Sequence, residues 1–156
     1  MKNLFFCAAM IAALMLTACG GNSDNQSYVD LGLPSGTKWA EQSEPGFYTY
    51  DQALQKFGKK LPTKEQMDEL ITYCLIQWDF DRNGLEVTGP NGKSMIWYAD
   101  GWKNCEGELY DKGSYGAIWS SSKFRENYGY DIIFGLSGAS VDFYTLCQGI
   151  CVRLVK

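Results

Sequence analysis

The sequence predicts a single α+β domain in which two helices are followed by small antiparallel sheets. Apolar residues recur with helical spacing between Thr49 and Cys74, in two segments that each begin with a capping-box pattern. From Cys74 onward, short alternating segments are separated by glycine-rich turns, which is typical of antiparallel strands. We therefore expect residues 28–156 to form one domain.

The first helix is predicted just after position 49. Thr49 and Gln52 have the spacing of a capping box, because a threonine side chain can accept from the backbone N–H three residues on. Leu54 and Phe57 share one face, and Gly58 is a typical stop signal. These signals predict a short helix that ends before Gly58.

The second helix carries the clearest pattern in the chain. Thr63 and Gln66 form another capping box directly after Pro62. The apolar positions that follow recur at i, i+3, i+4 and i+7 and so share a single helix face: Met67, Leu70, Ile71 and Cys74. This face is expected to pack on the core, with Cys74 at the helix end.

Most of the predicted strands lie on the C-terminal side of these helices. One strand-like alternation, in residues 29–33, precedes them. The later strands are two hairpins, one buried strand and a final strand: 86–88 with 94–97 around an Asn-Gly turn, 130–134 with 141–144 through Ser137-Gly138, 118–122, and 150–155. Residues 98–117 show no clear period and are expected to form a long irregular loop.

The first 18 residues have the features of a secretory signal peptide. Lys2 provides the positive charge, and residues 4–16 are apolar. This apolar stretch is shorter than the roughly 20 residues that a membrane-spanning helix needs. We therefore expect residues 1–18 to be removed on export.

The end of this signal resembles the lipobox of bacterial lipoproteins. Leu16, Thr17 and Ala18 precede Cys19, whose thiol takes a diacylglyceryl group and whose new amine is acylated after cleavage. Several acyl chains anchor a protein stably, whereas one chain does so only marginally. Cys19 is thus the predicted lipid attachment site, and the polar residues 19–27 are the predicted flexible tether.

This signal predicts a cell-envelope protein that is lipid-anchored to the outer membrane and does not span it. Both the periplasmic and the exterior face of that membrane are compatible with it. The membrane, reached through the lipid, is the one partner that the sequence predicts directly, and the oligomeric state is left open.

Composition excludes several function classes. The chain contains no histidine, which removes Ser-His-Asp and Cys-His catalysis and most catalytic zinc sites. The formal net charge is −4 and the sequence has no basic stripe, so nucleic acid is not an expected partner. We expect a protein that is not an enzyme and has no cofactor.

Four cysteines remain after cleavage and lipidation, in a compartment that permits disulfides. They are the disulfide candidates Cys74, Cys105, Cys147 and Cys151. Four cysteines allow three pairings, and sequence alone does not choose among them. On one straight strand Cys147 and Cys151 would lie about 13 Å apart, beyond the roughly 7 Å limit for a disulfide, so pairing them requires a turn.

Several phrases of the sequence occur together in one known family. They are VDLGLPSGTKWA (29–40), LPTKEQMDELI (61–71), VTGPNGKSM (87–95), YGAIWSSS (115–122) and ICVRLV (150–155). In this order they closely resemble the Fibrobacter succinogenes major paralogous domain, which is common in lipoproteins of Bacteroidetes. The resemblance covers nearly all of residues 28–156.

The resemblance implies a C-type-lectin-like fold, shared with the formylglycine-generating enzymes, with two early helices, small twisted antiparallel sheets and long loops. It implies packing and hydrogen-bonding roles for Trp39, Trp119 and Arg153, and it carries over no catalytic residue. The chain departs from the family pattern at Cys151, where serine is usual, and at residues 97–101.

The same resemblance raises one enzymatic alternative. Formylglycine-generating enzymes have paired copper-binding cysteines near the C-terminus, and thiolates are good copper(I) ligands. Cys147 and Cys151 could fill this role in a small copper-dependent oxidase. Against this alternative, their spacing is shorter than in those enzymes and the domain is about half the usual size.

One weak metal pattern lies between the helices and the first hairpin. Asp79, Asp81 and Asn83 begin like a calcium loop, D-x-D-x-N-G. A complete loop needs a bidentate glutamate at its twelfth position, which is Pro90 in this chain. A plain Asn-Gly turn explains the same residues without metal.

The predicted ligand site lies on the irregular segment and its neighbours. Aromatic faces beside hydrogen-bonding groups suit sugars and peptides, and the chosen residues are Trp102, Asp100, Tyr110 and Tyr128. The leading hypothesis is therefore a non-catalytic lectin-like domain that acts in ligand binding or adhesion, with a glycan or a protein as its ligand. A structural envelope or assembly component without a ligand is the alternative.

Overall fold

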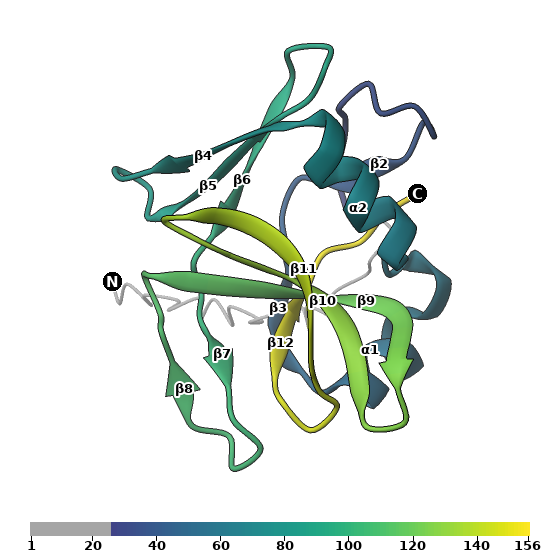
Figure 1. Cartoon of the computed structure of the whole chain (residues 1–156), viewed down its shortest axis with the longest axis vertical. Helices are drawn as coiled ribbons and strands as arrows, with labels where there is room; N and C mark the ends of the chain where they lie inside the picture. The colour runs from purple at the N-terminus through teal and green to yellow at the C-terminus, as the bar shows by residue number, and fades with distance from the viewer. Residues whose placement is uncertain (1–25) are drawn as a thin grey trace, which may run out of the picture.

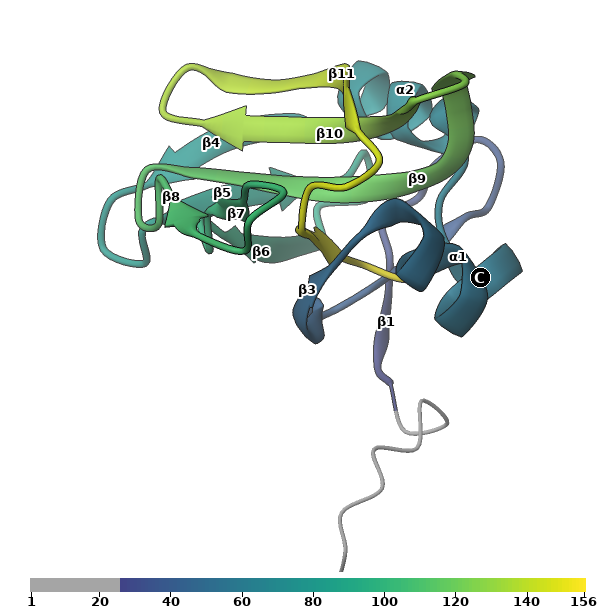
Figure 2. The ribbon, with the colours of Figure 1, turned by 90° about the horizontal axis from the view of Figure 1, so that it is seen from below.

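The structure is a computed structural model that describes residues 26–156. The predicted signal peptide, the lipid attachment site Cys19 and nearly all of the tether lie outside these residues. Figures 1 and 2 show one α+β body in which the sheets predominate and the two helices are short. None of the helices in this part of the chain has the length and apolar character needed to cross a membrane.

The largest sheet has five strands, in the order β11-β10-β9-β12-β3. Neighbouring strands in this sheet are antiparallel, except that β12 runs parallel to β9. The bounds of its strands are β3 Glu44–Tyr48, β9 Tyr115–Arg125, β10 Tyr128–Gly135, β11 Gly138–Thr145 and β12 Ile150–Val152. The long strands β9, β10 and β11 lie side by side in Figure 2.

Three smaller sheets surround the large one. They are antiparallel pairs or triplets: β1 Tyr28–Asp30 with β2 Lys38–Ala40, β4 Leu75–Asp79 with β5 Gly84–Thr88 and β6 Ser94–Tyr98, and β7 Trp102–Lys103 with β8 Leu109–Tyr110. Both predicted hairpins are confirmed: one is β5–β6, and the other is β10–β11.

Both predicted helices are confirmed with their caps. α1 spans Tyr50–Phe57, followed by a 3-10 turn at Gly58–Lys60, and α2 spans Lys64–Tyr73. Thr49 and Thr63 each accept from the backbone N–H three residues on, and the glutamine there bonds back to the cap, so each helix has a complete capping box.

The expectation that the helices come early is wrong in one respect, because three strands precede them. The sequence predicted one. It missed β2 and β3. β3 contains Pro45 and Gly46, two residue types that are unfavourable in a strand interior. Pro45 is tolerated because β3 is an edge strand of the sheet. β3 forms by pairing with the distant β12, with Tyr48 opposite Ile150.

Two further expectations need correction. Residues 98–117 are not one irregular loop, since they contain the hairpin β7–β8 and the start of β9. Strands of two residues are too short to show a period. The last strand ends at Val152, and Val155 instead forms an isolated bridge with Trp39.

Two apolar cores lie on opposite faces of the five-stranded sheet. Ile118 and Ile132 face a core that includes Met67 of α2 and Leu85 of β5. The residues next to them in sequence point the other way, and Trp119 belongs to a second core with Tyr50 of α1. The sheet is thus a shared middle layer.

The residues to which the family resemblance assigned packing roles are buried. Trp39 and Trp119 are fully enclosed. Arg153 is buried as well, and its Nη2 donates to the carbonyl oxygens of Glu41 (3.1 Å) and Ile96 (2.9 Å). Burial lowers the pKa of Arg153 to about 9.

Candidate functional site

The second face of the large sheet is covered only in part. Side chains alternate along a strand, so those that pair across strands share a face. Trp119 on β9 pairs with Asp131 on β10, which pairs with Asp142 on β11. The second core covers Trp119, whereas Asp142 and its neighbour on the same face, Ser140, are exposed.

We call the uncovered part the open sheet face. It is formed by the following side chains of β9, β10 and β11: Tyr115, Ile133, Ser140 and Asp142. It ends at Tyr144, which is half-buried against the second core and Trp102. Residues that are opposite each other on β10 and β11 form rows across the sheet. The partly buried Ile133 lies opposite Ser140 in one row, and Gly129 lies opposite Tyr144 in another.

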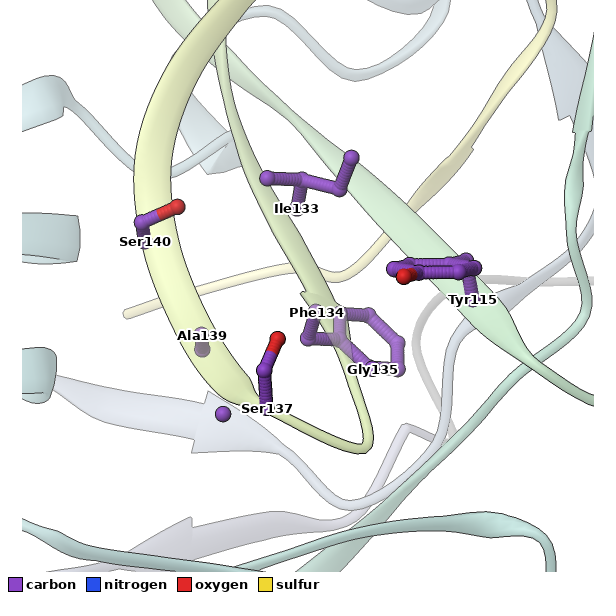
Figure 3. A pocket seen from close by; sticks show the side chains of 8 residues that line it. Tyr115, Ile133, Phe134, Gly135, Ser137, Ala139 and Ser140 are labelled. Atoms are coloured by element: carbon purple, nitrogen blue, oxygen red, sulfur yellow. The ribbon is translucent and has the colours of Figure 1, made fainter.

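A hollow of about 180 Å³ lies at one end of the open sheet face, where β10 turns into β11. Figure 3 shows Tyr115 on one side of it and Ser140 on the other, with Ile133 between them. The ring of Tyr115 lies against Gly135, where a Cβ atom would come within 2.7 Å of it, and the side chain remains 43% exposed. The lining offers hydroxyl groups and apolar surface but no charge.

A stack of three aromatic rings lies at the other end. Trp102 of β7 is between Tyr110 of β8, with ring centroids 5.1 Å apart, and Tyr144 of β11, with centroids 5.8 Å apart. The Trp102 Nε1–H donates to Oδ2 of Asp111 at 2.9 Å. Both faces of the Trp102 ring are therefore occupied, and the 42% exposed Tyr110 forms the outer end of the stack.

The β7–β8 hairpin that carries this stack is fastened to the loop before β12. Lys103 and Gly149 exchange two backbone hydrogen bonds, of 2.8 and 3.0 Å. A disulfide joins Cys105 to Cys147, with Cα atoms 5.1 Å apart. These links fix the position of Trp102 against Tyr144.

An ionisable group lies buried next to the open sheet face. Asp131 has no exposed surface, and neither of its carboxylate oxygens has a hydrogen-bond partner among residues 26–156. Burial, followed by the nearby charge of Asp142, raises its pKa to about 8. Burial also raises the pKa of Tyr144, with further contributions from Asp131, Asp142 and Asp111.

The structure brings together only part of the predicted ligand site. Trp102 and Tyr110 are in the same stack. Asp100 lies elsewhere, in a separate hollow of about 240 Å³ beside β3 and Cys151. Tyr128 also lies elsewhere, because it packs edge-on against Phe143, with centroids 5.7 Å apart.

Sequence reasoning missed the residues that β10 and β11 contribute to the open sheet face. The predicted hairpin 130–134 with 141–144 already implied that alternate residues share a face. That alternation could have grouped Ser140 with Asp142 and Tyr144. It could not have shown that this face is left uncovered, since that depends on where α1 packs.

The structure selects one pairing of the cysteines. Cys105 pairs with Cys147, and within the described part of the chain Cys74 and Cys151 carry free thiols. Burial raises the pKa of Cys74 to about 11 and that of Cys151 to about 12, so both remain protonated at neutral pH. The pair of free thiolates at 147 and 151 that a copper site would use is therefore not formed.

The calcium-like segment forms the turn between β4 and β5. Asp79 receives the backbone N–H of Arg82 on Oδ1 at 3.0 Å, and the Arg82 Nε is 2.9 Å from Oδ2. Asn83 has a positive φ of 47°, as a tight turn requires. From residue 26 to the C-terminus, no three His, Cys, Asp or Glu side chains are grouped so that they could hold a metal ion.

Comparison with protein-family models, with curated proteins and with solved structures gave no match for this chain. The family resemblance therefore depends on the sequence motifs alone. The functional argument depends on the geometry of the open sheet face and the aromatic stack.

Proposed function

We propose that this protein is a lipid-anchored lipoprotein of the cell envelope whose domain is a non-catalytic binding module for carbohydrate. The proposal includes the lectin-like fold and the outer-membrane location expected from the sequence. The observation that carries it is the arrangement of the open sheet face, with aromatic rings at both ends and polar groups between them.

This arrangement matches the chemistry of a sugar chain. Aromatic rings pack against the apolar faces of sugars, while hydroxyl and carboxylate groups bond to sugar hydroxyls. Tyr115 is available at one end, and Ser140 and Asp142 follow along β11 toward Tyr144. From Gly138, which is level with Tyr115, to Tyr144 the strand rises roughly 20 Å, which is room for several sugar rings.

Binding can be tested with Tyr115→Ala, because Tyr115 lies at the hollow and takes no part in the three-ring stack. We expect this variant to lose at least about tenfold in affinity for a glycan that binds the wild type, since a stacking ring is worth about 0.5–1.5 kcal/mol beyond the area it buries. The measurement is a glycan array followed by calorimetry on the full lipoprotein in detergent micelles.

Tyr98→Ala is the matched control, since Tyr98 is also exposed (53%) but lies on β6. Equal losses in both variants would contradict a site at Tyr115. An array without any bound glycan would contradict the proposed function and favour a structural envelope component.

The anchor is tested separately at Cys19. Cys19→Ala removes the thiol that takes the lipid, so we expect the protein to leave the detergent phase in phase partitioning. The control is Cys74→Ser, because Cys74 is not in the lipobox, and this variant should still partition into the detergent phase. An unchanged detergent fraction for Cys19→Ala would contradict the lipoprotein assignment.

A further inference from the structure

Two carboxyl groups lie opposite each other at the edge of the open sheet face, with Asp142 exposed on it and Asp131 buried beside it. Asp131 and Asp142 are directly opposite in the β10–β11 ladder, where the Cβ atoms of opposite residues lie about 5 Å apart. Like charges in this arrangement are destabilising. The ion pairs found in residues 26–156 join Lys38 to Asp30, Lys64 to Asp68 and Arg82 to Asp79, so neither of the two facing carboxyls is neutralised by a lysine or arginine.

The environment of Asp131 makes this pair more than a cluster of surface acids. The group is completely buried, and both of its oxygens lack a partner in the described chain, which is a costly state for a carboxyl group. The groups around it are Asp142 and Tyr144 from β11 and Trp119 from β9. Asp111, after β8, adds a third acid near Tyr144. These named neighbours include acids and aromatic rings but no basic side chain.

Such surroundings are complementary to a cation. An ammonium group donates charge-assisted hydrogen bonds to carboxylates and is attracted to aromatic faces. The exposed Asp142 offers the direct contact. Tyr144, two residues further along β11, is half-buried and stacked on Trp102, so it closes this end of the site. Asp131, behind them, supplies a second negative charge once it loses its proton.

The next row of the face indicates what else the ligand contains. Ser140 lies two residues before Asp142 on the same face of β11, and it lines the uncharged hollow together with Tyr115. A ligand that covers both rows therefore has a positive charge beside a neutral part rich in hydroxyl groups. An amino sugar has this combination, whereas a lysine-rich peptide has charge without the hydroxyl groups.

We propose that the Asp131–Asp142 pair binds the primary ammonium group of an amino sugar within the carbohydrate chain. This inference rests on the proposed function and names the ligand class of the same face. The ammonium donates to the Asp142 carboxylate, and the proton of Asp131 passes to solvent as the ion pair forms.

The test compares three probes on the full lipoprotein in micelles, by calorimetry at pH 6. The probes are a glucosamine tetramer, the corresponding N-acetylglucosamine tetramer, and a lysine tetrapeptide. We expect the glucosamine tetramer to bind at least tenfold more tightly than either of the others. Asp142→Asn should remove that preference, and Asp81→Asn, an exposed acid on the β4–β5 turn, should leave it unchanged.

Each other outcome has a distinct meaning. Equal affinity for the two tetramers overturns this inference and leaves the proposed function in place. Tight binding of the lysine peptide overturns the amino-sugar assignment in favour of a cationic protein segment. If no carbohydrate binds in the tetramer titrations or on the glycan array, the proposed function and this inference fail together.

A second readout separates Asp131 from a merely structural residue. At pH 6 the amine is already protonated, so ionisation of Asp131 on binding releases a proton that calorimetry in buffers of different ionisation enthalpy detects. Asp131→Asn should bind the glucosamine tetramer more weakly and without proton release. Proton release that persists in Asp131→Asn would overturn the role of this carboxyl.

Discussion

Asp131→Asn is expected to stabilise the unliganded protein by about 2–3 kcal/mol at pH 8 and to destabilise it by a similar amount at pH 4. The buried Asp131 carboxyl has a pKa of about 8 in the folded protein, against 3.8 for an ordinary aspartate. Each unit of such a difference corresponds to about 1.4 kcal/mol. The full difference gives an upper bound of roughly 6 kcal/mol at pH 8. The cost of the buried amide, about 3 kcal/mol, must be subtracted from it, and this cost is the same at pH 4, where nothing offsets it.

The direction follows from proton binding. Between pH 3.8 and about 8 the folded protein keeps the Asp131 proton that the unfolded chain has lost. Stability therefore falls as the pH rises through this range, and above the folded pKa the loss is complete. Asparagine has no proton to lose, so the variant lacks this fall.

The measurement is the free energy of unfolding by urea at several pH values between 4 and 9. Asp142→Asn is the control at the opposite, exposed position of the ladder, where a much smaller gain is expected. A pH dependence in Asp131→Asn that parallels the wild type would contradict the assignment. A stabilised variant that binds its amine ligand poorly would be the usual result when a strained binding group is removed.

Cys105→Ala combined with Cys147→Ala is expected to lower the free energy of unfolding by about 4 kcal/mol. The disulfide closes a loop with a sequence separation of 42 residues, and the chain-entropy model gives about this value for such a loop. A corresponding fall in melting temperature of more than about 10 °C is expected for a domain of this size.

The loss should be largest around the aromatic stack. Without the disulfide, the β7–β8 hairpin is held mainly by its pairing with Gly149 and by the contact of Trp102 with Tyr144. Amide exchange of Lys103 should therefore accelerate more than exchange in α2. Cys74→Ala is the control for loss of a cysteine, and an equal effect there would contradict a specific role for the disulfide.

The sequence by itself determined the elements that depend on local interactions. Thr49 and Thr63 fix the starts of the two helices, because a capping box involves residues only three positions apart. The turns of both hairpins were likewise readable, because Asn91-Gly92 and Ser137-Gly138 favour the required backbone conformations. Trp102 and Tyr110 were chosen for the ligand site as aromatic residues beside hydrogen-bonding groups in one irregular segment, and the two rings do stack on each other.

Only the tertiary structure decided the contacts between distant segments. The pairing of β3 with β12 and the choice of Cys147 as the partner of Cys105 depend on how the sheet brings remote residues together. The same is true of the open sheet face, where Tyr115 and Asp142 share a surface. A periodic pattern shows which residues share a side of a strand, but not which strands are neighbours or which side is covered.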